Sequence, residues 1–300
     1  TVVELQNEGF EVVIIYDLSN TRIEVLDGIY SITNQKPEFV QMDLKDKARV
    51  EAFFKSHSID GVIHFAASKA VGESVEKPLK YYENNIATLT YLLQAMEDKG
   101  VSNFIFSSSC TVYGQADELP ITEKAPVKKA ESPYGNTKQI GEEIIFDASR
   151  VTDLKAIALR YFNPIGAHES AKIGELPLGV PQNLIPFVTQ TAAGIRKELA
   201  VFGDDYPTPD GTAVRDYIHV VDLAKAHISA MKRLLEGRNK TSMEIFNVGT
   251  GKGSSVLEVI QAFEKLTEKK LNYKIVDRRE GDITAAYADT ALANQVLGWK

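Results

Sequence analysis

Short apolar strand patterns alternate with helical patterns through the first 160 residues, and this alternation restricts the fold more than any other feature. The apolar runs, such as Val12–Tyr16 and Phe104–Phe106, lack interspersed polar residues, which is typical of strands covered on both faces. Helical patterns lie between them, at about 46–57, 78–99 and 132–150. Strands that alternate with helices form parallel sheets. We therefore predict an α/β protein with a Rossmann-like, doubly wound parallel sheet.

The regular alternation ends near Asn163. Glycines and prolines recur over the next two dozen residues, as far as Pro186, which is typical of a loop-rich connection. We therefore predict a first domain over residues 1–164 and a smaller α/β lobe over residues 165–300. To this lobe we assign helices that begin near 183, 220 and 255 and a strand at Ile245–Val248.

Charge and cysteine content exclude several classes of protein. The 34 basic and 41 acidic side chains give a net charge of −7, which argues against a nucleic-acid binder because such proteins are normally basic. The one cysteine, Cys110, cannot form an internal disulfide, which favours a reducing compartment and therefore the cytoplasm.

The longest apolar runs fall far below the ~18 residues of a membrane helix, so we expect no membrane span. The five histidines form no pair at metal-ligand spacing, so we expect no metal.

Both ends of the chain are abrupt. The pattern at Thr1–Gly9 is that of an amphipathic helix already under way, and Gly9 is its expected left-handed stop. The last residues, Leu297–Lys300, directly follow a helical segment. We therefore expect the printed chain to be a fragment of a longer protein.

Tyr134 and Lys138 are separated by four residues in a helical pattern, so their side chains share one helix face. Alone, such a pair is as readily an ordinary surface pair. A hydroxyl-rich segment, Ser107–Gly114, follows the strand Phe104–Phe106, where open α/β sheets place their ligands. Its alternative interpretation is a turn whose hydroxyls satisfy local backbone groups. We predict that this segment and the Tyr/Lys pair face one crevice.

These side chains suit removal of a proton from a sugar or alcohol hydroxyl together with loss of a hydride. A free tyrosine has a pKa of ~10, so it is a poor base at neutral pH. The Lys138 ammonium and a cationic nicotinamide would both favour the Tyr134 phenolate. Ser109 would hydrogen-bond to the reacting oxygen and hold it against the phenolate.

Acidic and basic residues suggest where a dinucleotide and a diphosphate would bind. Asp17 ends the strand pattern at 11–17, where dinucleotide-binding folds place the acid that accepts ribose hydroxyls, and its charge favours NAD over NADP. Arg215 and Arg279 have guanidinium groups that suit a diphosphate. The alternative is that both arginines are solvated surface charges.

Five segments together closely resemble the UDP-glucose 4-epimerases, which belong to the extended short-chain dehydrogenase/reductases. They follow the order of that family over essentially the whole chain: His64–Ser74, Ser107–Gly114, Ser132–Lys138, Arg160–His168 and Asp210–His219. The resemblance implies a tightly held NAD, interconversion of UDP-galactose and UDP-glucose in galactose metabolism, and a homodimer formed through a helical face of the first domain. It also implies that residues 1–164 bind NAD and that residues 165–300 mainly bind the UDP-sugar.

The resemblance implies roles for individual residues as well. Tyr134 corresponds to the catalytic base, Lys138 to its activator and ribose ligand, and Ser109 to the hydroxyl partner. Positions that contact NAD in the family also include Asp17, Asn20, Asp43, Leu44, Phe65, Ala66, Lys69, Asn84 and Tyr161. Positions that hold the UDP-sugar also include Asn163, Asn183, Leu184, Ala200, Phe202, Arg215, Arg279, Asp282 and Ala286.

The sequence departs from the family pattern at four places. The Gly-x-x-Gly-x-x-Gly strand-turn and the last few dozen residues of the family have no counterpart here. The loop after Asp17 is one residue shorter than the usual Asp-Asn-Leu-Ser-Asn. Ala286 stands where some members have a bulky tyrosine. Since alanine leaves room for an N-acetyl group, we hypothesise that UDP-N-acetyl sugars are also accepted.

Rival functions remain open at this point. A nucleotide-sugar 4,6-dehydratase of the same superfamily commonly has Asp-Glu after a threonine, whereas Val112 follows Thr111 here. A UDP-glucuronate epimerase or decarboxylase matches the five segments less well. A non-catalytic NAD-sensing regulator commonly loses the tyrosine or the lysine, and this chain keeps both.

Overall fold

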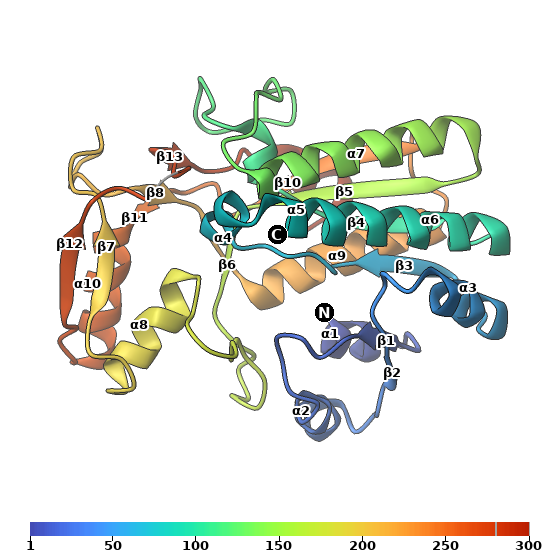
Figure 1. Ribbon diagram of the computed structural model, residues 1–300, viewed down its shortest axis with the longest axis horizontal. Coiled ribbons are helices and arrows are strands. Elements are labelled where there is room, and N and C mark those ends of the chain that lie inside the picture. The colour runs from blue at the N-terminus through green and yellow to red at the C-terminus, as the bar shows by residue number, and fades with distance from the viewer. Residues whose placement is uncertain (280, 300) are drawn as a thin grey trace.

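A four-stranded parallel sheet forms the centre of the molecule, in the order β10-β5-β4-β3. The computed structural model describes residues 1–279 and 281–299 (Figure 1). The strands of this sheet are β3 (Gly61–His64), β4 (Asn103–Ser109), β5 (Lys155–Tyr161) and β10 (Met243–Val248). A separate parallel pair is formed by β1 (Val13–Tyr16) and β2 (Glu38–Gln41). The predicted α/β, Rossmann-like class is confirmed.

Helices cover both faces of the central sheet, as a doubly wound fold requires. On one face, Phe104 and Phe106 of β4 pack with residues of α3 (Lys47–Ser56), α6 (Thr88–Lys99) and α7 (Pro133–Val151). On the other face, Ile105 packs with residues of α9 (Val220–Leu235) and α11 (Ala291–Leu297). The remaining helices are α1 (Val2–Asn7), α2 (Val25–Thr33), α4 (Val71–Glu76), α5 (Pro78–Tyr82), α8 (Leu184–Ala192) and α10 (Val256–Thr267).

The central strand is longer than the sequence predicts. The prediction ends it at Phe106, but β4 continues through Ser107, Ser108 and Ser109, all of them buried. Serine can occupy these positions because the first two hydroxyls have side-chain partners: Ser107 hydrogen-bonds to Tyr161 and Ser108 to Glu142. The Ser109 hydroxyl accepts from the backbone N–H of Thr111 and caps a short 3₁₀ helix.

The helix predicted over 78–99 contains a π-helical turn at Glu83–Ala87, between α5 and α6. Asn85 in this turn is buried and bonds in both directions with the backbone of Ser68, and it also donates to Thr137 on α7 at 2.9 Å. Such turns are frequent at functional sites. This one fixes Asn84, a predicted NAD contact, beside the loop that follows β3.

The second lobe contains fewer elements than the sequence predicts. The strand expected there at Ile245–Val248 is β10, which pairs with β5 in the central sheet, and α9 packs under the same sheet. That part of the prediction is wrong, because strand pairing across about 80 residues leaves no trace in the local pattern. The lobe itself is built from α8, α10 and the parallel pair β7 (Leu199–Phe202) and β12 (Tyr273–Val276) around one apolar core.

Short strands connect the lobe to the main sheet layer (Figure 1). β6 (Asn163–Ile165) spans the predicted domain boundary and pairs with β9 (Tyr217–His219). β8 (Val214–Arg215) lies between β11 (Ser254–Ser255) and β13 (Ala285–Ala286). Among the described residues, no helix combines the length and apolar character needed to cross a membrane.

Candidate active site

Tyr134 and Lys138 lie on the first two turns of α7, beside the carboxyl end of β4. The helix starts there because the Ser132 hydroxyl accepts from the Gly135 N–H at 3.1 Å and Pro133 occupies the first helical position. The Lys138 ammonium lies 5.8 Å from the centre of the Tyr134 ring and donates to the Ser107 carbonyl at 2.6 Å. The Tyr134/Lys138 pair therefore lies beside the serine segment, as predicted.

Burial controls the ionisation of this pair. It lowers the pKa of Lys138 to about 8, and the nearby Glu142 carboxylate partly offsets that effect. Burial also raises the pKa of Tyr134 well above its ordinary value; Tyr161 raises it further, whereas a hydrogen bond with Ser109 lowers it. In the protein alone, burial is the largest effect on the Tyr134 hydroxyl and disfavours the phenolate.

The other residues expected on the NAD side follow the carboxyl ends of parallel strands. The Asp17 carboxylate accepts from the Ser19 N–H at 2.9 Å, and the Asp43 carboxylate does the same with Lys45. Tyr161 ends β5 and bonds to Ser107. The set comprises Asp17 and Asn20 after β1, Asp43 and Leu44 after β2, Phe65, Ala66 and Lys69 after β3, and Asn84 in the π-helical turn.

The shortened loop after β1 has an unusual backbone. Leu18 lies in the left-handed region with φ of 61°. Residues other than glycine rarely adopt this conformation, because their Cβ atom crowds the following carbonyl oxygen. The loop that is one residue shorter than the family pattern is therefore strained beside Asp17.

Phe65 has 44% of its surface exposed although it directly follows a strand of the central sheet. Its ring centre lies 4.7 Å from that of His227, whose Nε2 is buried and has no hydrogen-bond partner in the part of the chain that the structure describes. Nearby, the Lys69 ammonium lies 3.6 Å from the Glu175 carboxylate, which also accepts from the Asn183 amide at 2.7 Å. Glu175 therefore joins one residue expected on the NAD side to one expected on the sugar side.

Three charged residues expected to hold the UDP-sugar meet in the second lobe. Arg215 donates to Asp282 at 2.5 Å, and Arg279 reaches the same carboxylate at 3.3 Å. The Arg279 guanidinium lies 5.8 Å from the ring centre of Phe202, and its Nε is buried without a hydrogen-bond partner among the described residues. An unpartnered buried N–H is costly, so this arrangement suits an anion that would accept it.

The other sugar-side positions lie on several different elements. Ala286 pairs with Arg215 in the β13–β8 register, and at 1% exposure it packs with Val112, Tyr113 and Phe162. The backbone N–H of Asn163 donates to the Asp216 carbonyl at 2.9 Å. Asn183 precedes α8, Leu184 begins it, and Ala200 lies in β7 with Phe202.

The family follows from comparison with known proteins. The chain is 49% identical over 301 residues to UDP-glucose 4-epimerase of Bacillus subtilis, and the match covers all of this chain and 88% of the Bacillus protein. The mouse (Mus musculus) enzyme of the same name is 50% identical over 306 residues, with 100% and 87% covered. The chain belongs to the UDP-glucose 4-epimerase family. A family model described as GDP-mannose 4,6 dehydratase also matches residues 1–300.

Solved structures of UDP-glucose 4-epimerases have the same fold. The enzyme of Bifidobacterium longum, solved in complex with NAD+ and UDP, superposes with a TM-score of 0.96 at 46% identity, covering 99% of this chain and 88% of that one. The UDP-Glc/GlcNAc 4-epimerase of Campylobacter jejuni has a TM-score of 0.83 at 34% identity, with 100% and 89% covered. Family membership and fold therefore agree.

Beside the candidate site lies a buried charged pair that the sequence did not predict. Glu142, on α7, forms an ion pair with Arg160, on β5, and both side chains are at most 9% exposed. Two signals could have revealed it. Glu142 lies one helical turn after Lys138, and Arg160 is a charged residue that ends the apolar run 156–159.

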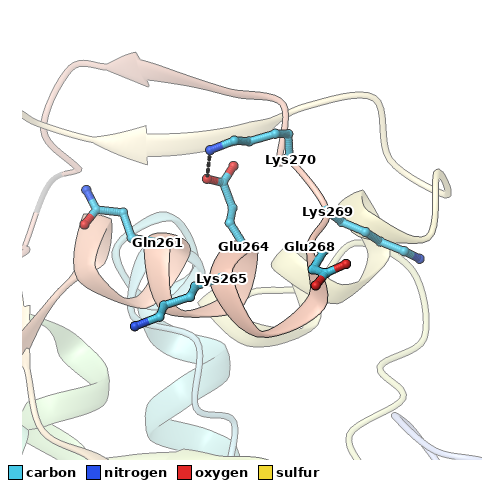
Figure 2. Close-up of a pocket in the computed structure, with 6 residues that line it drawn as sticks. All are labelled: Gln261, Glu264, Lys265, Glu268, Lys269 and Lys270. Atoms are coloured by element: carbon cyan, nitrogen blue, oxygen red, sulfur yellow. Dashed lines mark hydrogen bonds and ion pairs between the residues drawn. The ribbon is translucent and has the colours of Figure 1, made fainter.

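A surface hollow at the end of α10 lies apart from the candidate site (Figure 2). It is lined by Gln261, Glu264, Lys265, Glu268, Lys269 and Lys270, and Lys270 pairs with Glu264 at 2.8 Å. No predicted site residue borders it. Within the described residues, no three His, Cys, Asp or Glu side chains gather as metal ligands.

Proposed function

We propose that this protein interconverts UDP-galactose and UDP-glucose with NAD as its cofactor, as an enzyme of galactose metabolism. The observation that carries the proposal is the joining of Tyr134 and Lys138 to the serine end of β4, in a chain 49% identical to a named UDP-glucose 4-epimerase. Complexes of related epimerases with NAD and UDP support the choice of cofactor and substrate.

The residues present fit NAD. Among the described residues the Lys138 ammonium has one acceptor, the Ser107 carbonyl, although an ammonium has three N–H donors. Its other donors suit ribose hydroxyls. Asp17 uses one carboxylate oxygen for Ser19, which leaves the other for a second ribose. The residues that would hold NAD are Asp17, Asn20, Asp43, Leu44, Phe65, Ala66, Lys69, Asn84, Tyr134, Lys138 and Tyr161. When bound, NAD accepts a hydride from carbon 4 of the sugar and later returns it.

Tyr134 moves the proton in this scheme. As the phenolate, it takes the proton of the sugar 4-hydroxyl while Ser109 hydrogen-bonds to the same oxygen. Lys138 holds a positive charge near the ring and lowers the free energy of the phenolate. After the 4-keto sugar turns its other face, Tyr134 returns the proton to the 4-oxygen. The proton balance of a complete turnover is therefore zero.

The second lobe would hold the nucleotide. Arg215 and Arg279 would bind the diphosphate, and Asp282 holds both guanidinium groups in place. Asn163, Asn183, Leu184, Ala200, Phe202 and Ala286 would complete the contacts with the UDP-sugar. Since the nucleotide would stay bound while the sugar turns, either face of carbon 4 could be presented to the bound cofactor, with the 4-oxygen within reach of Tyr134.

We also propose that the enzyme accepts UDP-N-acetyl sugars. The small Ala286 side chain supports this wider specificity. The related Campylobacter jejuni protein, described as a UDP-Glc/GlcNAc 4-epimerase, provides a precedent.

The proposed homodimer would use the helical face of the first domain. Its support is a group of exposed apolar side chains on α5 and α7: Leu79 is 81% exposed, Phe146 52% and Val151 83%. A sedimentation measurement of wild type and Phe146→Glu tests it. A monomeric wild type would refute the dimer.

Tyr134→Phe tests the enzyme against the alternative of an NAD-sensing regulator. The variant keeps the ring and loses the hydroxyl that carries the proton. We expect loss of turnover with unchanged UDP affinity. Turnover equal to wild type would refute the role of Tyr134.

A further inference from the structure

Three buried side chains, Ser108, Glu142 and Arg160, form a hydrogen-bonded cluster near Lys138. The Glu142 carboxylate accepts from Arg160 Nε at 2.9 Å and Nη2 at 2.5 Å, and from the Ser108 hydroxyl at 2.5 Å. Ser108 is fully buried, Arg160 is 3% exposed and Glu142 is 8% exposed. A buried carboxylate is costly unless it is paired and hydrogen-bonded, and here it is both.

This cluster and Lys138 attach α7 to neighbouring residues of one strand. Lys138 donates to the carbonyl of Ser107, and one helical turn later Glu142 accepts from the side chain of Ser108. The two bonds connect the first half of α7 to adjacent residues of β4. Arg160 extends the attachment to β5, and its guanidinium lies 4.8 Å from the ring centre of Tyr113.

Glu142 lies one helical turn after Lys138 on α7, and its charge partly offsets the lowering of the Lys138 pKa by burial. The titratable and charged groups around Lys138 and Tyr134 are Glu142 on α7, His64 on β3, Arg160 and Tyr161 on β5, Cys110 after β4, and Tyr81 on α5 with its partner Glu73 on α4. Burial lowers the pKa of His64 to about 3 and raises the pKa values of Cys110 and Tyr161, so these three are neutral at pH 7. The Glu73 carboxylate forms ion pairs with Lys77 and Lys80.

We propose that Glu142, held by Arg160 and Ser108, is a positioning residue that keeps the Lys138 ammonium charged and directed at the Ser107 carbonyl. Because Glu142 is 8% exposed and its carboxylate is occupied by Arg160 and Ser108, it would act through Lys138 rather than on a ligand directly. Its effect on turnover rests on the function proposed above. Its effect on the charge of Lys138 does not.

A series of variants tests the proposal, and each variant has an expected direction for the shift in the Lys138 pKa. Glu142→Gln removes the negative neighbour, so the pKa of Lys138 should fall by about one unit, a tenfold shift toward the neutral amine. Arg160→Gln removes a positive neighbour and should raise it. In the double variant the pKa of Lys138 should lie between its values in the two single variants. Ser108→Ala, which keeps both charges and removes one hydrogen bond, should lower the pKa slightly and is the variant least disruptive to folding.

The readout is NMR titration of lysine ¹³Cε-labelled protein, with the Lys138 signal assigned by its loss in Lys138→Met. The basic limb of the pH–rate profile should move in the same direction as the NMR value. A Lys138 titration that stays at its wild-type pH in every folded variant, with only the melting temperature lowered, would overturn the proposal. A shifted titration in a protein with no epimerase activity would instead refute the proposed function and retain the role of Glu142.

Discussion

The Lys138 ammonium on α7 donates to the backbone carbonyl of Ser107 on β4 at 2.6 Å, and both residues are buried. This bond brings a cation to the carboxyl end of a parallel strand, where the tyrosine of the same helix also lies. Within the described residues this buried ammonium has a single hydrogen-bond acceptor, which is unfavourable for stability. Its position is therefore better explained by a ligand than by the fold.

Removal of this ammonium should separate stability from activity. In Lys138→Met, a flexible apolar chain of similar length replaces a desolvated charge. We expect the melting temperature to stay equal or rise while kcat falls by at least about 10²-fold, a typical loss for a group that assists proton transfer. Calorimetry and steady-state kinetics measure the two effects. A large fall in melting temperature would show that the lysine is structural.

The pH dependence of stability should report the same residue. Burial lowers the folded-state pKa of Lys138 from 10.5 to about 8, so between these values the unfolded chain binds more protons and stability rises with pH. Below pH 8 both states are protonated and the full penalty, about 3 kcal/mol, remains. The unfolding free energy of wild type minus that of Lys138→Met should therefore increase from pH 8 to pH 10.5. A flat difference would contradict the burial argument.

Tyr134→Phe should lower kcat by about 10³-fold, because general acid–base groups contribute 10²–10⁴-fold. UDP affinity, measured by calorimetry, should stay within about twofold because Arg215 and Arg279 lie in the other lobe. Tyr82→Phe is a matched control: its hydroxyl accepts from the Asn136 amide on the same helix at 2.7 Å and has no role in the scheme. Equal losses in both variants would indicate a general effect on α7.

The strained loop after Asp17 offers a stability prediction. Leu18→Gly should stabilise the protein by up to about 1 kcal/mol, because glycine accepts a positive φ without crowding and this gain exceeds its entropy cost. Leu18→Ala keeps the Cβ atom and is the control that should show no gain. Thermal unfolding of both variants measures the effect. A more stable alanine variant would contradict the strain argument.

Ala286→Tyr should narrow the range of sugars. The wild type should convert both UDP-galactose and UDP-N-acetylgalactosamine, and the variant should lose at least about tenfold of its turnover on the acetylated sugar. Since Ala286 is buried beside Phe162, the melting temperature and UDP-galactose turnover must be measured as controls. An unchanged ratio of the two turnovers would show that size at this position does not select the sugar.

Local patterns were sufficient to predict most of the elements and the Tyr134–Lys138 arrangement. The signals lie within a few residues: Ser132 and Pro133 start the helix, and a spacing of four residues aligns the two side chains. Residue chemistry and position also indicated Ser109, Asp17, Arg215 and Arg279, and family resemblance supplied the remaining site residues. In the structure Arg215, Arg279 and Asp282 meet as a group, although Arg215 and Arg279 are 64 positions apart in the sequence.

Features that depend on distant partners were missed for a physical reason. β10 belongs to the central sheet because of its pairing with β5, and no nearby residue encodes that choice. Ser107 and Ser108 extend β4 because Tyr161 and Glu142 satisfy their hydroxyls from other elements. Arg160 is tolerated in a buried strand only because Glu142 lies opposite it. Each of these features depends on contacts between residues that are far apart in the sequence.

The most direct test of the account is conversion of UDP-galactose by the purified protein, with and without added NAD, followed by NMR of the anomeric protons. The account predicts that the UDP-galactose signal decays and the UDP-glucose signal appears until the two reach equilibrium, with no net consumption of NAD. Folded protein that binds UDP and NAD and leaves UDP-galactose unchanged would contradict it.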